Sequence, residues 1–110
     1  MEGQRLIEAT CPDCRGPLTE TENGELLEYR CLVGHVYSAR SVLQCHSEAQ
    51  ENALWAAVVA LEESANLVRA VAPNFPPDLA ARLEAQAAGK LRQAAEVRRV
   101  LEQLGPFQLE

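Results

Sequence analysis

The sequence predicts a mostly α-helical chain in which a small N-terminal β zinc-ribbon-like knuckle precedes a long antiparallel two-helix hairpin. Three observations predict this fold class. Cysteine and histidine side chains in the first 40 residues fall into two close clusters. An Asn-Gly pair lies between the clusters, flanked by segments of strand composition. Residues 38–72 contain neither Pro nor Gly, and a Pro-rich segment then separates them from a second helical pattern.

The N-terminal segment reads as an extended run followed by a β-hairpin. Residues 6–10 lead into the first cysteine cluster. Asn23-Gly24 is the strongest two-residue hairpin signal, because both turn positions then accept positive φ. Residues 18–22 and 25–30 are the flanking strands. The hairpin should therefore fold the chain back and bring the second cluster beside the first.

The two clusters together have the composition of a metal site. Cys11 and Cys14 are three residues apart, and Cys31 and His35 are four residues apart. Three thiolates and one imidazole at these spacings are typical of a tetrahedral Zn²⁺ site. A segment this short, with few large apolar residues, also needs a metal to stay folded.

Turn-forming residues support each half of the predicted site. Pro12 restricts φ directly after the first ligand. Gly16 follows the second ligand, where we expect a tight knuckle to need a residue without a Cβ. Gly34 lies between the last two ligands and allows the chain to curl round the ion.

Two alternatives concern the chemistry of this site. A Cys-x-x-Cys pair alone could be a redox dithiol, but here it precedes a hairpin and two further ligands match it. Cys45 and His46 compete with His35 for the fourth position, and the spacing favours His35. Four protein ligands leave no coordination position for water or substrate, which predicts a structural ion rather than a catalytic one.

The rest of the chain predicts two helices. Ser38, or failing that Ser41, is the expected N-cap of a helix over about residues 39–71. Pro73 to Pro77 break it, a second helix covers about 78–104, and Gly105-Pro106 ends that helix. Gly89 marks either close packing or a weak point. The apolar seams are Leu54, Val58, Leu61, Ala65, Val68 and Ala72 in the first helix, and Leu79, Leu83, Ala87, Leu91, Ala94, Val97, Leu101 and Leu104 in the second.

These elements predict two parts, a zinc-binding knuckle over residues 1–37 and a helical hairpin over residues 38–110. Both helices carry apolar residues beyond one seam, including Trp55, Val59 and Leu67. We expect the hairpin to dock against a second copy, forming a homodimer, or against another protein. Alternatively, Trp55 and its neighbours cover the junction between hairpin and knuckle.

Charge and composition restrict the function and the compartment. Sixteen acidic and ten basic residues give a formal charge of −6, and residues 1–46 and 47–110 are both net acidic. This distribution argues against nucleic-acid and anionic-membrane binding. The sequence has no apolar run long enough to cross a bilayer and no recognisable signal peptide, which predicts a cytoplasmic protein with no membrane insertion.

Several motifs resemble one bacterial module. They are Cys11-Pro12-x-Cys14-x-Gly16-x-Leu18, then Tyr29-x-Cys31-x-Val33-Gly34-His35-x-Tyr37-Ser38, then Ala53-Leu54-Trp55-Ala56-Ala57 and Ala60-Leu61-Glu62-Glu63. This order resembles the C-terminal zinc-knuckle and helical-hairpin extension of chemotaxis protein-glutamate methylesterase-type proteins. The resemblance covers about residues 9–104 and implies a metal site together with a role in chemotaxis-like or two-component signalling. It does not imply esterase activity, because the chain contains no Gly-x-Ser-x-Gly elbow.

The sequence therefore favours a non-catalytic, zinc-structured protein–protein interaction or oligomerisation module in bacterial signalling. One alternative is a nucleic-acid-binding zinc ribbon, for which only Arg15, Arg30 and Arg40 supply positive charge near the knuckle. A second alternative is a zinc or thiol-redox enzyme, which would need an open metal position or a free Cys11–Cys14 dithiol.

Overall fold

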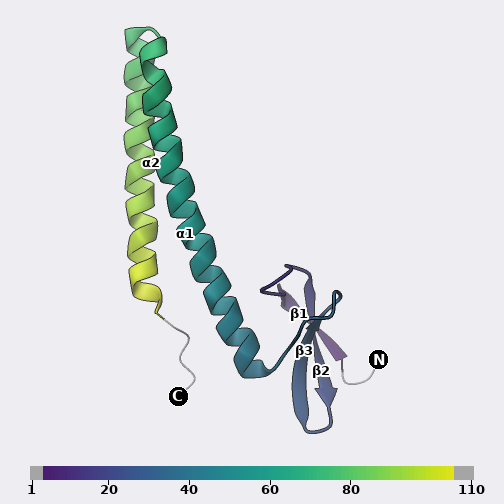
Figure 1. Ribbon diagram of the computed structural model, residues 1–110. Coiled ribbons are helices and arrows are strands. Elements are labelled where there is room, and N and C mark those ends of the chain that lie inside the picture. Colours follow the sequence, from purple (N-terminus) through teal and green to yellow (C-terminus); the bar gives the residue numbers. More distant parts are fainter. Residues whose placement is uncertain (1–3, 106–110) are drawn as a thin grey trace. The chain divides into compact units, whose positions relative to one another are not determined.

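The computed structural model of the protein describes residues 4–105 (Figure 1). An antiparallel four-stranded sheet precedes two helices, which confirms the predicted fold class. The described residues form two compact units, residues 4–50 and residues 51–105, whose boundary lies within the first long helix. The elements are β1 (Gln4–Thr10), β2 (Pro17–Asn23), β3 (Leu26–Cys31), β4 (Val36–Tyr37), α1 (Ala39–Val71), the short 3-10 helix η1 (Ala72–Asn74) and α2 (Pro77–Leu104).

The sheet has the strand order β1-β2-β3-β4, so each strand pairs with its neighbour in sequence. The predicted extended run is β1, and β4 is an additional strand of two residues. Pairing of β1 with β2 shifts between Ile7, opposite Leu18, and Thr10, opposite Pro17. Between these two pairs β1 advances by three residues and β2 by only one. Such an irregularity resembles a β-bulge, which bends the strand, here just before Cys11.

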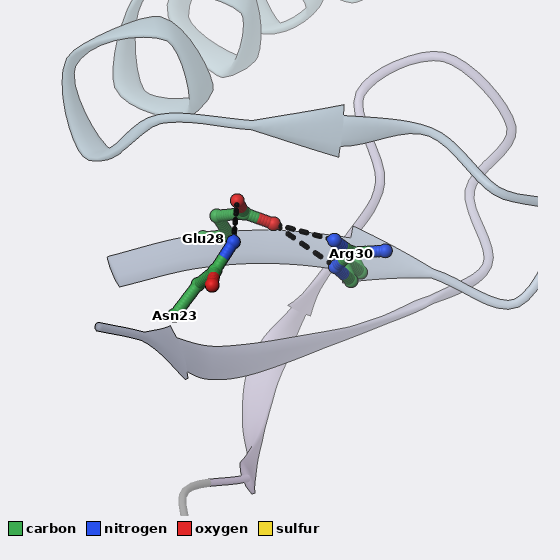
Figure 2. Close-up of polar contacts among 3 residues, drawn as sticks. All are labelled: Asn23, Glu28 and Arg30. Carbon is green, nitrogen blue, oxygen red and sulfur yellow. Dashed lines mark hydrogen bonds and ion pairs between the residues drawn. The ribbon is translucent and has the colours of Figure 1, made fainter. Parts of the chain in front are cut away.

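The β2–β3 hairpin turns one residue later than the Asn23-Gly24 prediction. Asn23 still pairs with Leu26, so the two turn residues are Gly24 and Glu25. Gly24 has φ +67°, which fits a turn that needs positive φ at its first central position only. Asn23 instead donates its side-chain amide to Glu28 Oε1 at 2.9 Å, while Arg30 contacts the other oxygen of that carboxylate (Figure 2).

Residues 4–50 have a small core built largely from the predicted ligand segments. Four of its buried residues come from the sheet and its loops, and one comes from the first turn of α1. Partly buried apolar side chains pack around them, among them Ile7 and Cys45. Two of the five buried residues are predicted metal ligands, and the core contains few large apolar side chains. The buried set is Cys11, Leu18, Cys31, Tyr37 and Val42.

The helix boundaries follow the predicted signals closely. Ser41 N–H donates to Ser38 Oγ at 3.1 Å, which confirms Ser38 as the N-cap of α1. The Pro-rich break contains η1, and α2 begins at Pro77, one residue earlier than predicted, with proline in the first turn. Gly105 ends α2 with φ +59°. The predicted contribution of Pro106 lies outside the described residues.

Residues 51–105 form an antiparallel pair of helical segments (Figure 1). Two ion pairs join the C-terminal part of α1 to α2, Arg69 with Glu84 at 3.4 Å and Arg98 with Glu62 at 3.1 Å. The predicted seam positions are buried or half-buried, except that Leu104 is 38% exposed. The fully buried positions are mostly small, namely Val58, Ala65, Ala72, Ala87 and Ala94.

Within residues 4–105, no helix combines the length and the apolar character that a membrane span requires.

Candidate metal centre

The first half of the site is a tight turn after β1. Cys11 N–H donates to the Gly16 carbonyl at 2.7 Å, and Arg15 N–H donates to the Cys11 carbonyl at 2.9 Å. Arg15 holds the left-handed backbone conformation, with φ +65°. A Cβ at Gly16 would lie 3.4 Å from Cys14 Sγ, at the short limit of ordinary contact, so a side chain there would press against a predicted ligand. The strained position of this turn precedes the glycine.

The second half is the loop from β3 to β4. Cys31 N–H donates to the His35 carbonyl at 3.1 Å, and Gly34 N–H donates to the Cys31 carbonyl at 3.3 Å. Gly34 has φ +114°, a conformation that side chains disfavour, so the prediction that glycine is needed here is confirmed. His35 N–H also donates to Cys31 Sγ at 3.3 Å and ties the two ligands together.

The two loops bring the four predicted ligands into one cluster. One ligand atom from each of Cys11, Cys14, Cys31 and His35 lies within 4.8 Å of the others. The Nδ1 atom of His35 lies 3.2 Å from Cys31 Sγ and 3.6 Å from Cys11 Sγ. A tetrahedral zinc site with bonds of about 2.3 Å to sulfur and about 2.0 Å to nitrogen separates its ligand atoms by roughly 3.5–3.8 Å. The donor set and its spacing therefore fit a metal ion.

The competing residues Cys45 and His46 lie outside this cluster. Cys45 is half-buried and packs against the core of residues 4–50. His46 lines an apolar pocket of about 340 Å³ together with Tyr29 and Leu43. Among the described residues, His35 thus supplies the fourth donor.

The loops also favour the thiolate form that metals bind. Burial raises the pKa of the Cys31 thiol, but hydrogen bonds led by the His35 N–H outweigh it and lower that pKa to about 6. Burial likewise opposes ionisation of Cys11, yet hydrogen bonds led by the Tyr37 hydroxyl lower its pKa. The sulfurs of Cys31 and Cys11 in turn raise the pKa of His35. For Cys14, the Gly16 N–H favours ionisation, but burial and the neighbouring thiols prevail and raise the pKa.

Two residues that the sequence analysis did not assign to the site contact it. The Tyr37 hydroxyl lies 3.3 Å from Cys11 Sγ and donates a hydrogen bond to the Asp13 carboxylate. Burial, followed by the Asp13 hydrogen bond, raises the pKa of Tyr37, so the phenol keeps its proton. The sequence could have indicated both residues by their positions beside the predicted ligands. Asp13 lies within the Cys-x-x-Cys motif, and Tyr37 follows His35 by two residues.

The fold and the cluster together define a small β-sheet unit with a Cys₃His group that could hold a metal ion, followed by a helical hairpin. Comparisons with protein-family models, with curated proteins and with solved structures found no match.

Proposed function

We propose that the protein is a non-catalytic module in which a zinc ion fixes residues 4–37 and the helical hairpin makes protein–protein contacts. The cluster of four donor atoms within 4.8 Å carries this proposal. Three thiolates and an imidazole form a donor set that suits Zn²⁺, whereas Mg²⁺ and Ca²⁺ prefer oxygen ligands. Four protein ligands complete a tetrahedral shell and leave no position for a substrate or an activated water.

The distribution of apolar side chains supports contacts through the hairpin. Alanines occupy most of the buried seam of residues 51–105, so the two helices bury few large side chains against each other. Larger side chains remain at the surface, with Leu67 65% exposed and Val59 49% exposed. Small helical units usually need oligomerisation or a larger core. We therefore propose a second copy of the chain as the partner, since it supplies the same apolar surface and doubles the buried core.

We also propose a role in bacterial chemotaxis-like or two-component signalling. Only the resemblance to methylesterase extensions, over about residues 9–104, supports this part of the proposal. The genes beside the one that encodes this chain provide a test. A receptor, histidine kinase or methylesterase gene in that neighbourhood supports the pathway, and an unrelated neighbourhood contradicts it.

Native mass spectrometry tests the metal assignment. The expected result is one zinc per chain, and a tetrahedral thiolate spectrum after cobalt substitution. Cys14→Ser should weaken zinc binding by more than about tenfold, because even outer-shell partners of a metal contribute tenfold or more. Cys45→Ser is the matched control and should bind as tightly as the wild type. The proposal that four protein ligands complete the shell would be overturned if Cys45→Ser lost zinc. It would also be overturned if the cobalt spectrum indicated only three protein ligands.

Sedimentation tests self-association. At micromolar concentration the expected mass is twice that of the 12.1 kDa chain. Leu67→Glu should shift the mass toward a single chain, because it places a charge on the proposed interface. Leu26→Glu, which changes an exposed side chain of the sheet, is the control and should leave the mass unchanged. A wild-type mass equal to one chain contradicts the dimer.

A further inference from the structure

The Tyr37 hydroxyl lies between two groups that both accept hydrogen bonds. It is 3.3 Å from Cys11 Sγ and also contacts the Asp13 carboxylate. Tyr37 is 8% exposed and is held in place by the pairing of β4 with β3, where it faces Tyr29. Asp13, by contrast, is exposed. The hydroxyl position is therefore fixed by the sheet, while the carboxylate reaches it from the surface.

A phenol has only one hydrogen to donate. An ionised carboxylate only accepts, and a metal-bound cysteine sulfur is a thiolate that likewise only accepts. In the metal-loaded protein, Cys11 and Asp13 would therefore share a single donor. Cys31 does not share this difficulty, because its sulfur receives the backbone N–H of His35 at 3.3 Å. Of these two cysteines, only Cys11 has a hydroxyl contact that a carboxylate also uses.

We propose that Asp13 competes with the Cys11 thiolate for the Tyr37 hydrogen and thereby makes the site release its ion more readily. The inference rests on the proposed function, in which these four residues hold zinc. Hydrogen bonds to a coordinated thiolate disperse its charge and stabilise the complex, so a donor diverted to Asp13 weakens metal retention. Tyr37 then acts as a positioning residue for Cys11, and Asp13 regulates it.

The experiment measures zinc transfer to a colorimetric chelator from the full-length protein. Asp13→Asn replaces the carboxylate with an amide that is a weaker acceptor and can donate to the phenol oxygen. The Tyr37 hydrogen then becomes available to Cys11, and zinc release should slow by roughly tenfold. In the cobalt-substituted protein the sulfur-to-metal charge-transfer band should move to higher energy, because a hydrogen bond stabilises the sulfur lone pair. A purely structural role of Asp13 would not move this band.

Asp13→Asn is also made in the Tyr37→Phe variant, which has no phenol hydrogen. This comparison separates the effect of the Tyr37 hydrogen bond from the effect of the Asp13 charge. If the phenol transmits the effect, Asp13→Asn changes neither the release rate nor the band when residue 37 is Phe. The inference is overturned if Asp13→Asn accelerates release, leaves it unchanged, or slows it equally in both backgrounds. A wild-type protein that binds no zinc overturns the proposed function as well. Stoichiometric zinc binding combined with a failed Asp13 result overturns this inference alone.

Discussion

Glu28 is held in the hairpin by two partners, Asn23 and Arg30. Asn23 donates to one of its oxygens, and Arg30 contacts the other at 2.6 Å (Figure 2). These contacts, led by Asn23, lower the pKa of Glu28 below 4.5. Because the folded pKa lies below the unfolded one, Glu28 stabilises the fold above about pH 4.5, and this stabilisation is lost as the pH falls through the lowered value.

Asn23→Ala should therefore raise the pKa of Glu28 toward its ordinary value. It should also destabilise the fold modestly at neutral pH, because the ionised carboxylate loses a hydrogen-bond donor. NMR titration of the Glu28 carboxyl from pH 7 downward measures the midpoint. Arg30→Gln is the comparison and should produce a smaller rise, since Arg30 ranks below Asn23 among the causes. An unchanged midpoint in Asn23→Ala would contradict the assignment.

At the residue scale, the sequence predicted which four side chains cluster, but it did not predict the residues around them. Spacing alone selected Cys11, Cys14, Cys31 and His35, because short loops leave few ways to converge. The contact of Tyr37 with Asp13 joins residues 24 positions apart, and it depends on the pairing of β3 with β4, which places Tyr37. No local pattern encodes such a contact.

At the element scale, Gly89 in α2 has a testable role. A Cβ at this position would meet only Arg92 Nη2, at 3.6 Å, so no neighbouring element needs the missing side chain. Of the two sequence-based explanations, the structure favours a weak point over close packing. Gly89→Ala should stabilise the protein by about 1 kcal/mol, the difference in helix propensity between the two residues.

Denaturant unfolding followed by helical circular dichroism measures this gain. Ala94→Gly makes the reverse change in the same helix, at a side chain that is only 2% exposed. It should cost more than Gly89→Ala gains, because it also removes a buried methyl group. A destabilising Gly89→Ala would mean that the glycine has a packing or functional role.

Element boundaries were predictable wherever a single residue type marks them. Ser38 starts α1 and the Pro-rich segment interrupts the helices at the expected positions, since capping and φ restriction act locally. The turn at Gly24-Glu25 differed by one residue, because Asn23 stays in the ladder and uses its side chain instead. The two-residue strand β4 is too short to show alternation.

At the scale of the whole molecule, periodicity predicted which faces of the helical hairpin are buried. It did not indicate the boundary between the compact units. Sequence composition changes at residues 37–38, whereas the structure groups the first turns of α1 with the sheet, up to Gln50. The helical pattern is continuous over residues 39–71. It predicts a helix, but it does not show which part of the molecule each turn of that helix packs against.

The two units should respond differently to removal of the metal. Residues 4–50 have a small core in which two of the proposed ligand cysteines are buried, so a chelator should unfold the sheet of the zinc-loaded protein. The ion pairs and the small-residue seam of residues 51–105 include none of the four ligands, and these helices should persist. Helical circular dichroism should therefore fall only in part.

The aromatic residues report on this difference separately. Both tyrosines, Tyr29 and Tyr37, lie in the sheet, while the single tryptophan, Trp55, lies in the second unit with Arg98 5.4 Å from its ring centre. Chelation of the zinc-loaded protein should change the tyrosine near-ultraviolet signal and leave Trp55 fluorescence almost constant. Restored zinc should return the tyrosine signal. If Trp55 fluorescence shifts in step with the tyrosines, the hairpin depends on the metal site, and the independence of the two units is refuted.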